Sequence, residues 1–214
     1  MSLQLQVHFL GHAAFALDNG QGRLCLDPHR PGAVGGRFNL PEIVGPFDAI
    51  AITHAHEDHA GWTPALGTDR VIDSDADFAG FSLQFRAVPH DAVGGAQMGW
   101  SRMIKIRFDR WTVVHCGDIG AWTDADIEWL RGVDLLLVPV GGTYTIDGAQ
   151  AAELVRRCEP KMVLPMHARD PRIDLPLAPV DDFLGACQRP VFRRSSLDLA
   201  SSPEQPCTVL LDAP

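Results

Sequence analysis

Apolar residues occur along the chain in short runs that predict many strands and few helices. Residues 3–10 and 81–88 alternate between polar and apolar side chains, as half-buried strands do, whereas residues 47–52 and 133–140 are nearly continuous apolar runs typical of buried strands. We expect residues 75–80 to form a turn between strands. Further strands are expected at residues 13–17, 23–26, 70–73, 102–108, 111–116, 161–167 and 207–212.

Helical spacing of apolar residues is confined to a few segments. Thr123 and Asp147 are residue types that cap helices, and apolar residues at helical spacing follow each of them. Gly67 would end a short helix soon after the first buried strand. The four helices expected are residues 60–66, 123–132, 149–158 and 180–189. Strands followed by helices therefore occur in both halves of the chain.

The composition is that of one globular domain, residues 1–214. Apolar residues make up 46% of the chain, enough for a substantial core. The first ten residues alternate and carry no basic segment, so we expect a strand there and no signal peptide. No apolar run approaches the roughly 18 residues of a membrane span. The five cysteines are scattered without a Cys-x-x-Cys pair, which favours a reducing, cytoplasmic location.

One segment, residues 53–61, concentrates three imidazoles and two carboxylates directly after a buried strand. Imidazole nitrogen and carboxylate oxygen are ligands that zinc and similar cations prefer. His54 and His56 lie two positions apart, so in extended backbone they point the same way and can bind one cation. Asp58 and His59 follow where the chain turns and would face a second cation. A histidine-rich surface loop is the alternative interpretation.

The order His54-x-His56-x-Asp58-His59 resembles the signature of the metallo-β-lactamase superfamily. That family also has a later histidine, a Gly-Asp pair and a last histidine after a strand, which match His90, Asp118 and His167. The chain most resembles the small, uncapped metal-dependent hydrolases that include the L-ascorbate-6-phosphate lactonases. The matching segments are residues 10–15, 26–28, 138–145 and 165–167, and the chain departs from this group at residues 168–170, where an aromatic residue is frequent.

The resemblance implies an α/β fold, a four-layer αββα sandwich with two mixed sheets flanked by helices. It implies two divalent metal ions, zinc first, with manganese, iron or nickel as alternatives. The first ion would be held by His54, His56 and His90, the second by Asp58, His59 and His167, with Asp118 between them. A hydroxide bound to both ions would attack an ester, lactone or phosphodiester of a small, even anionic, substrate. Asp58 and Asp118 would be the catalytic residues.

Four further residues and one loop are candidates for supporting the metal site or binding substrate. His12 follows the first strand and is either near the metals or a capped structural histidine. Asp27 is either a partner that orients a ligand histidine or a turn-capping residue before Pro28. The amides around Thr143 and Tyr144 could hold an oxyanion. Residues 29–41 would line the rim of the pocket or form a mobile loop. Cys116 is expected to lie in the core, and His115 is expected on the opposite face of the same strand and is left out of the site.

The main function expected is metal-dependent hydrolysis of a small molecule. An iron-dependent oxidoreductase on the same scaffold and a non-catalytic metal-binding module are the alternatives, and a nuclease ranks below both. The net charge of −9 argues against nucleic-acid binding, because proteins that bind nucleic acids usually carry a basic surface. No membrane partner is expected. A homo-oligomer is expected if a neighbouring subunit covers the uncapped site.

Overall fold

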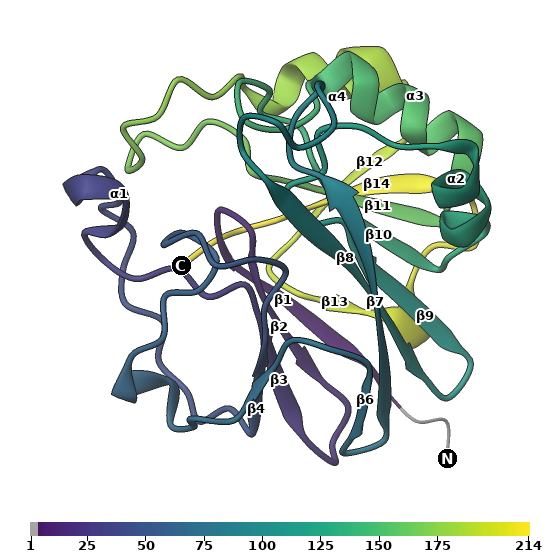
Figure 1. Ribbon diagram of the computed structural model, residues 1–214. Coiled ribbons are helices and arrows are strands. Elements are labelled where there is room, and N and C mark those ends of the chain that lie inside the picture. The colour runs from purple at the N-terminus through teal and green to yellow at the C-terminus, as the bar shows by residue number, and fades with distance from the viewer. Residues whose placement is uncertain (1–3) are drawn as a thin grey trace.

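Two mixed β-sheets pack face to face in the computed structural model, which describes residues 4–214 (Figure 1). The first sheet has six strands in the order β13-β1-β2-β3-β4-β5, and only the β3-β4 and β4-β5 pairs are parallel. Its strands are β1 (Gln6–Gly11), β2 (Ala14–Asp18), β3 (Arg23–Leu26), β4 (Ala49–Ala51), β5 (Val71–Ile72) and β13 (Leu197–Asp198).

The second sheet has eight strands in the order β12-β14-β11-β10-β9-β8-β7-β6. The neighbours from β12 to β9 are parallel, and those from β9 to β6 are antiparallel. The carboxyl ends of β9, β10 and β11 therefore meet at one edge. The strands are β6 (Ala76–Phe78), β7 (Phe81–Pro89), β8 (Trp100–Phe108), β9 (Trp111–His115), β10 (Leu135–Pro139), β11 (Met162–Met166), β12 (Val191–Arg194) and β14 (Cys207–Leu211).

Alternation along the strands divides the core into layers. Leu135 and Leu137 of β10 pack in the cluster between the sheets, whereas Leu136 and Val138 pack in the cluster under the helices. The helices α2 (Asp124–Leu130), α3 (Gly148–Cys158) and α4 (Val180–Cys187) cover this outer face of the second sheet (Figure 1). None of the helices within residues 4–214 is both long and apolar enough to cross a bilayer.

The outer face of the first sheet has a different cover. Ile43 and Phe47 from an irregular segment and Leu66 from a single 3-10 turn, η1 (Pro64–Leu66), pack on it. The fold class, two mixed sheets with helices, is as expected, but helices cover mainly the second sheet. The helix expected at residues 60–66 is reduced to η1, because Pro64 has no amide proton and fits only the first turn of a helix.

Most expected strands and helices are confirmed, and the errors lie in short elements. Residues 75–80, expected to be a turn, contain β6, whose three residues pair with β7. The strands β12 and β13, the 3-10 turn η2 (Leu199–Ser201) and the short segment α1 (Ala33–Gly36) were not expected. β12 carries two arginines, which an edge strand tolerates because one side of it faces solvent. The first expected strand begins at Gln6 in the structure, and its residue Leu3 lies outside the described residues.

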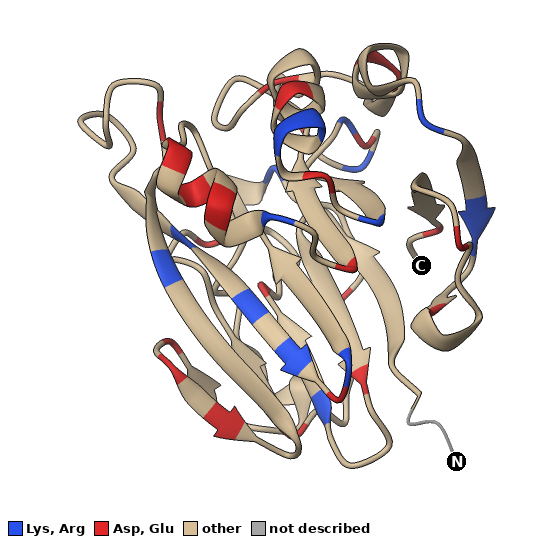
Figure 2. Cartoon of the chain, turned by 90° about the vertical axis from the view of Figure 1, so that its right-hand side faces the viewer, with Lys and Arg blue, Asp and Glu red and all other residues tan. Residues whose placement is uncertain are grey.

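An ion pair and a contact between a lysine and an aromatic ring attach α2 to the second sheet. Figure 2 shows basic residues along neighbouring strands beside a helix that carries acidic residues. Arg86 of β7 donates to the carboxylate of Asp126, and Lys105 of β8 lies 4.1 Å from the centre of the Trp129 ring. Thr123 and Asp126 also form a capping box at the start of α2. The predicted cap is therefore confirmed, and it orients the helix that follows the loop after β9.

Leu137→Ala tests the core between the sheets. Leu137 is fully buried in the middle of β10, so its truncation leaves a cavity that neighbouring strands cannot fill. We expect the free energy of unfolding to fall by about 2–5 kcal/mol in urea denaturation. Val191→Ala on the edge strand β12, where the side chain is 43% exposed, is the control and should change it by less than about 0.5 kcal/mol. An equal decrease in the free energy of unfolding in the two variants would show that β10 is not part of a tightly packed core between the sheets.

Candidate metal centre

The predicted metal ligands all follow strand ends at one edge of the two sheets. Residues 54–59 come after β4 of the first sheet. His90 follows β7, Asp118 follows β9 by a short turn, and His167 follows β11, all in the second sheet. The packing of the sheets therefore brings together residues that are more than one hundred positions apart. This is the edge at which open α/β sheets bind ligands.

The carboxylate of Asp118 lies at the centre of the cluster. Its Oδ2 atom is 3.2 Å from Nε2 of both His59 and His90, 3.4 Å from Nε2 of His167 and 3.8 Å from Nε2 of His54. Asp118 is 2% exposed. Four imidazoles from both sheets thus surround one buried carboxylate oxygen.

The ligand atoms form three overlapping groups, one of which joins His54 and His59 to Asp27, and the other two contain the remaining predicted histidine ligands. Of these other two, His54, His56 and His90 make one, and His12, Asp58, His59 and His167 make the second, with ligand atoms within 4.8 Å of one another in each group. These two groups correspond to the two cation positions expected from the sequence, with His12 added to the second.

Unpaired buried atoms show that the cluster fits cations. Nε2 of His59, Nε2 of His90 and Oδ1 of Asp118 are buried and have no hydrogen-bond partner within residues 4–214. A buried polar atom without a partner is costly, and imidazole nitrogen and carboxylate oxygen are zinc ligands. A pair of divalent cations would satisfy these atoms.

Hydrogen bonds to the outer ring nitrogens orient three of the imidazoles. His59 donates from Nδ1 to Oδ2 of Asp27 at 2.7 Å, and His90 donates from Nδ1 to the Tyr144 carbonyl at 3.0 Å. His54 Nδ1 lies 2.9 Å from Oγ1 of Thr53, which itself donates to Asp27. Each Nε2 consequently faces the centre, where it can accept a cation once its proton has been released.

Asp27 is the buried anchor of these contacts. Both its oxygens accept hydrogen bonds from Thr53, at 2.8 Å from the amide and 2.7 Å from the hydroxyl. Burial opposes its ionisation, but His115 and His59 hold the pKa of this carboxyl below its ordinary value. Of the two interpretations of Asp27, the structure therefore shows the contact with a histidine of the cluster.

His115 lies on the face of β9 opposite Cys116, as expected; it was left out of the site, but it contacts residues that support the cluster. Its Nε2 donates to the Ala13 carbonyl at 2.8 Å and lies 3.9 Å from Asp27. The face of β9 opposite Cys116 is the face between the two sheets, where the supporting residues lie. Ser101 was also missed: its hydroxyl accepts from the amide of Asp118 at 3.1 Å. No local pattern marks either residue, since both depend on the pairing of distant strands.

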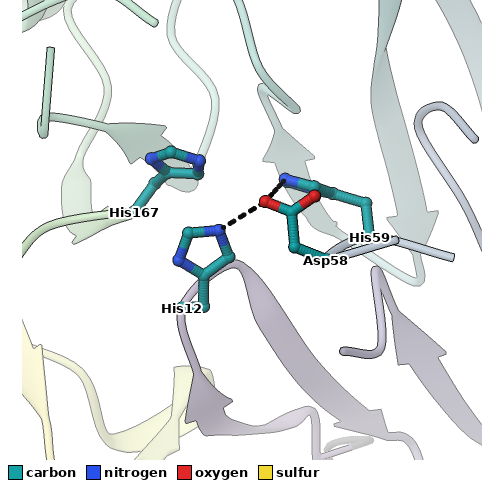
Figure 3. A group of neighbouring side chains, drawn as sticks. All are labelled: His12, Asp58, His59 and His167. Carbon is teal, nitrogen blue, oxygen red and sulfur yellow. Dashed lines mark hydrogen bonds and ion pairs between the residues drawn. The ribbon is translucent and has the colours of Figure 1, made fainter. Parts of the chain in front are cut away.

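His12 contacts the cluster directly. Its Nε2 lies 3.1 Å from Oδ2 of Asp58, and the same side-chain group includes His59 and His167 (Figure 3). The rings of His12 and His167 are 4.0 Å apart, centre to centre. Because an ionised carboxylate only accepts, His12 must donate from Nε2 to Asp58. His12 therefore fixes the orientation of one predicted ligand.

The loop of residues 29–41 packs against the site. Phe38 is 1% exposed and meets the His12 ring edge-on at 4.9 Å. Glu57 joins the loop to the central motif, accepting from Arg30 at 2.9 Å and from the Val34 amide at 2.8 Å. Val34 also lines the cavity beside the cluster. The expectation that this loop lines the pocket is met at Val34, and Phe38 belongs to a small core of its own.

The turn after β10 was expected to offer free amides to an oxyanion, and two of these amides are already used. The amide of Gly142 donates to the Ile146 carbonyl at 3.2 Å, and that of Tyr144 donates to the Gly142 carbonyl at 2.7 Å. The Thr143 hydroxyl donates to the Pro176 carbonyl at 2.8 Å, and Thr143 is exposed. Tyr144 lines the cavity, but Thr143 does not.

A cavity of about 270 Å³ opens beside the cluster. The predicted ligands His56, Asp58, His90, Asp118 and His167 form its base. Five further residues complete the wall: Val34, Glu57, Met98, Tyr144 and Leu175. Sequence reasoning had given no role in the pocket to Met98 or Leu175. These wall residues come from separate loops, so only the folded chain brings them together.

The buried imidazoles differ in charge. Burial lowers the pKa of His12 and of His54 to about 3. Burial also disfavours protonated His59, but the carboxylates of Asp118 and Asp58 raise its pKa well above the ordinary value. The pKa of Asp118 lies well below its usual range, because nearby imidazoles outweigh the effect of burial. Without metal, the carboxylates therefore favour the protonated form of His59, and Asp118 also raises the pKa of His90 against the effect of burial.

Comparisons with known proteins agree with this geometry. A model of the beta-lactamase superfamily domain matches residues 6–167. The chain is 29% identical over 194 residues to a UPF0173 metal-dependent hydrolase of Pyrococcus abyssi and 26% identical over 194 residues to one of Pelotomaculum thermopropionicum; 76% of this chain and 84% of each relative are covered. It is also similar to the crystal structure of a protein from Thermotoga maritima that is assigned as a zinc-dependent hydrolase of the metallo-beta-lactamase superfamily. The TM-score is 0.77 and the sequence identity is 27%; the similarity covers 98% of this chain and 100% of the Thermotoga maritima chain.

Gly141→Ala tests how the backbone places His167. A Cβ atom on Gly141 would lie 2.1 Å from the His167 carbonyl oxygen, so the turn that carries His167 must move. We expect zinc affinity, measured by competition with a chromogenic chelator, to fall at least about tenfold. Gly185→Ala, which meets nothing within 4 Å in α4, is the matched control and should bind zinc as the wild type does. Unchanged affinity in Gly141→Ala would show that His167 is not held by this contact.

Lowering the pH tests the two strongly shifted imidazoles. With a pKa of about 3, His12 and His54 stay neutral in the folded, metal-free protein as the pH falls from about 8 to about 5. In the unfolded chain the same rings gain protons near pH 6.5, so the stability linked to them is present above about pH 6.5 and is lost as the pH falls toward 3. Nitrogen-15 NMR of the ring nitrogens measures this directly. Protonation of either ring above about pH 5 would contradict the prediction.

Proposed function

The chain belongs to the metallo-β-lactamase superfamily and is a metal-dependent hydrolase of that superfamily, and from this premise we propose that it uses two divalent cations to hydrolyse a small ester or lactone. One observation carries the proposal. Four imidazoles converge on Oδ2 of Asp118 at the base of a cavity, and three of the buried ligand atoms have no partner within residues 4–214.

The chain's own residues divide between the two cations. His54, His56 and His90 would hold the first. Asp58, His59 and His167 would hold the second, and Asp118 would lie between them. A bound pair of this kind lowers the pKa of a water molecule and polarises the bond to be broken. Zinc suits this mixture of imidazole and carboxylate best, and manganese, iron and nickel are alternatives.

As an alternative to a role as ligand only, Asp58 would move a proton in the reaction. It lines the cavity, and His12 holds one of its oxygens from the opposite side at 3.1 Å. Its remaining oxygen can accept a proton from an attacking water and return it to the leaving oxygen. Burial opposes ionisation of Asp58, but His59 and His12 keep its pKa below the ordinary value, so it begins as the base.

The cavity wall favours a small, uncharged substrate. Val34, Met98 and Leu175 give it an apolar side, and no lysine or arginine occurs among the described residues that line it. An anionic group could therefore be held only by the cations. The acidic Glu57 at the wall, which accepts a hydrogen bond from the exposed Arg30, further disfavours an anion. A lactone or ester with an apolar substituent fits this wall better than a phosphodiester does.

The position of the cavity favours catalysis over a purely structural metal site. Catalytic metal sites keep an open position for water or substrate, whereas structural sites are closed by protein ligands. Here five predicted ligands line a cavity of about 270 Å³, so the cations would be reachable from it.

Asp118→Asn tests the proposal. The amide nearly preserves the shape of the side chain but removes the negative charge that would be shared by the two cations. We expect the wild type to hold about two metal ions per chain and the variant to hold fewer, and we expect kcat/KM of the variant to fall about 100-fold or more. Metal is measured by mass spectrometry, and hydrolysis with an activated acetate ester, a γ-lactone and an activated phosphodiester. Asp77→Asn, an exposed aspartate on β6, is the control and should retain both metal and activity.

Three results would overturn the proposal. The first is a folded wild-type protein that binds no divalent cation. The second is a cation-loaded protein inactive on all three substrates, and the third is an Asp118→Asn variant that keeps full activity. Phosphodiester hydrolysis without ester or lactone hydrolysis would reject the substrate class but leave the metal centre in place.

A further inference from the structure

One residue in the wall of the cavity beside the metal cluster has a strained backbone. Val34 lies in the left-handed region, with φ 53° and ψ 51°, and it lines that cavity. A β-branched residue is an outlier there, because its methyl groups crowd the backbone. Gly32, Gly35 and Gly36 around it also have positive φ, which glycine adopts readily. Val34 is therefore the residue of this turn whose conformation must be imposed by its surroundings.

The carboxylate of Glu57 holds Val34 in this conformation. Glu57 directly follows the predicted ligand His56, so its position is tied to that of the metal cluster. Its Oε2 atom accepts from the Val34 amide at 2.8 Å, and its Oε1 atom accepts from Arg30 at 2.9 Å. A hydrogen bond from an amide to a carboxylate is charge-assisted and can offset the strain of one residue. Without Glu57, the turn would relax and Val34 would leave its place.

The turn around Val34 belongs to a wall that two loops build together. Ala33 and Phe38 are 0% and 1% exposed and pack in a small apolar cluster, so the turn is fixed on both sides of its exposed tip. Backbone hydrogen bonds of 2.8 Å and 2.9 Å join this loop to residues 168–178, the loop after β11. Val34 and Leu175, one from each loop, pack against the same cluster and line the cavity.

We propose that Glu57 is a positioning residue and that Val34 and Leu175 select the aliphatic substituent of the substrate. This inference rests on the proposed hydrolysis of an ester or lactone and narrows its substrate class. The substituent packs against the two branched side chains while the ester group lies at the metal cluster. A cavity of about 270 Å³ is small for a binding pocket, so short substituents of butyryl size fit it better than long chains.

The size of the expected preference follows from the burial of methylene groups. Each methylene that moves from water to an apolar wall favours binding about fourfold. A butyryl group has two methylenes more than an acetyl group, so the wall should favour it by about tenfold. Loss of the Val34 side chain, or of the contact that holds it, should remove most of this preference.

Alkyl hydroxamates test the wall without turnover, because the hydroxamate group binds zinc and the alkyl chain is left to contact the protein. With zinc-loaded protein, we expect isothermal titration calorimetry to show that wild type binds butyrohydroxamate about tenfold more tightly than acetohydroxamate. Val34→Gly, which adopts the same backbone without strain but has no side chain, should bind the two about equally. The ratio of kcat/KM for nitrophenyl butyrate and nitrophenyl acetate should change in the same way.

Variants of Glu57 separate positioning from a general effect on the site. Glu57→Ala should lose the preference as Val34→Gly does, whereas Glu57→Gln, whose oxygen can still accept from the Val34 amide, should keep most of it. In Val34→Gly, the added change Glu57→Ala should alter the preference no further, because no side chain is left to position. In metal-free protein, the Val34 amide of Glu57→Ala should exchange its hydrogen at least about tenfold faster by NMR. Glu42→Ala, at an exposed glutamate after this loop, is the control and should behave as wild type.

The inference is overturned if wild type binds the two hydroxamates equally or if Val34→Gly keeps the preference. It is also overturned if Glu57→Ala changes neither the preference nor the exchange of the Val34 amide. A zinc-loaded protein that shows the hydroxamate preference but hydrolyses no ester or lactone would reject the proposed function and retain the wall. Ester hydrolysis with no preference for butyrate over acetate would support the hydrolysis and reject the wall.

Discussion

The structure depends on the burial of one carboxylate, that of Asp118, between the two sheets. A buried carboxylate is costly unless charged or polar partners surround it. Here the partners are imidazoles brought from strand ends of both sheets, four of them within 3.8 Å of the same oxygen. The sheets must therefore pack in one particular register for the cluster to be satisfied. The apolar core between them, which includes Phe15 and Leu137, maintains that register.

Around this cluster lies a set of hydrogen bonds to the outer ring nitrogens, which turns the inner nitrogens toward Asp118. Asp27, Thr53 and the carbonyl of Tyr144 take the outer protons of three histidines. The same contacts would be made with or without cations, so the inner nitrogens are already aimed before a cation arrives. Such preorganisation reduces the cost of ordering the ligands on binding.

The sequence was most informative where chemistry is local. Strand-ending histidines, the caps at Thr123 and Asp147 and most strands could be predicted, because residue type and spacing decide them within a few positions. The order of the candidate ligands came from a family resemblance, and the structure brings them into one cluster. What could not be predicted depends on tertiary pairing. His115 and Ser101 contact the site only because β9 and β8 lie beside the first sheet, and β6 is too short to have a pattern.

The division of the candidate ligands between the sheets has a mechanical consequence. Residues after β4 and the bend at His12 belong to one sheet, while His90, Asp118 and His167 belong to the other. Cations bound by residues of both sheets would cross-link the two sheets at the edge where the strands end. Separating the sheets would then require the release of both cations. Resistance of the molecule to pulling, heat and proteases would rise and fall with the supply of metal in its surroundings.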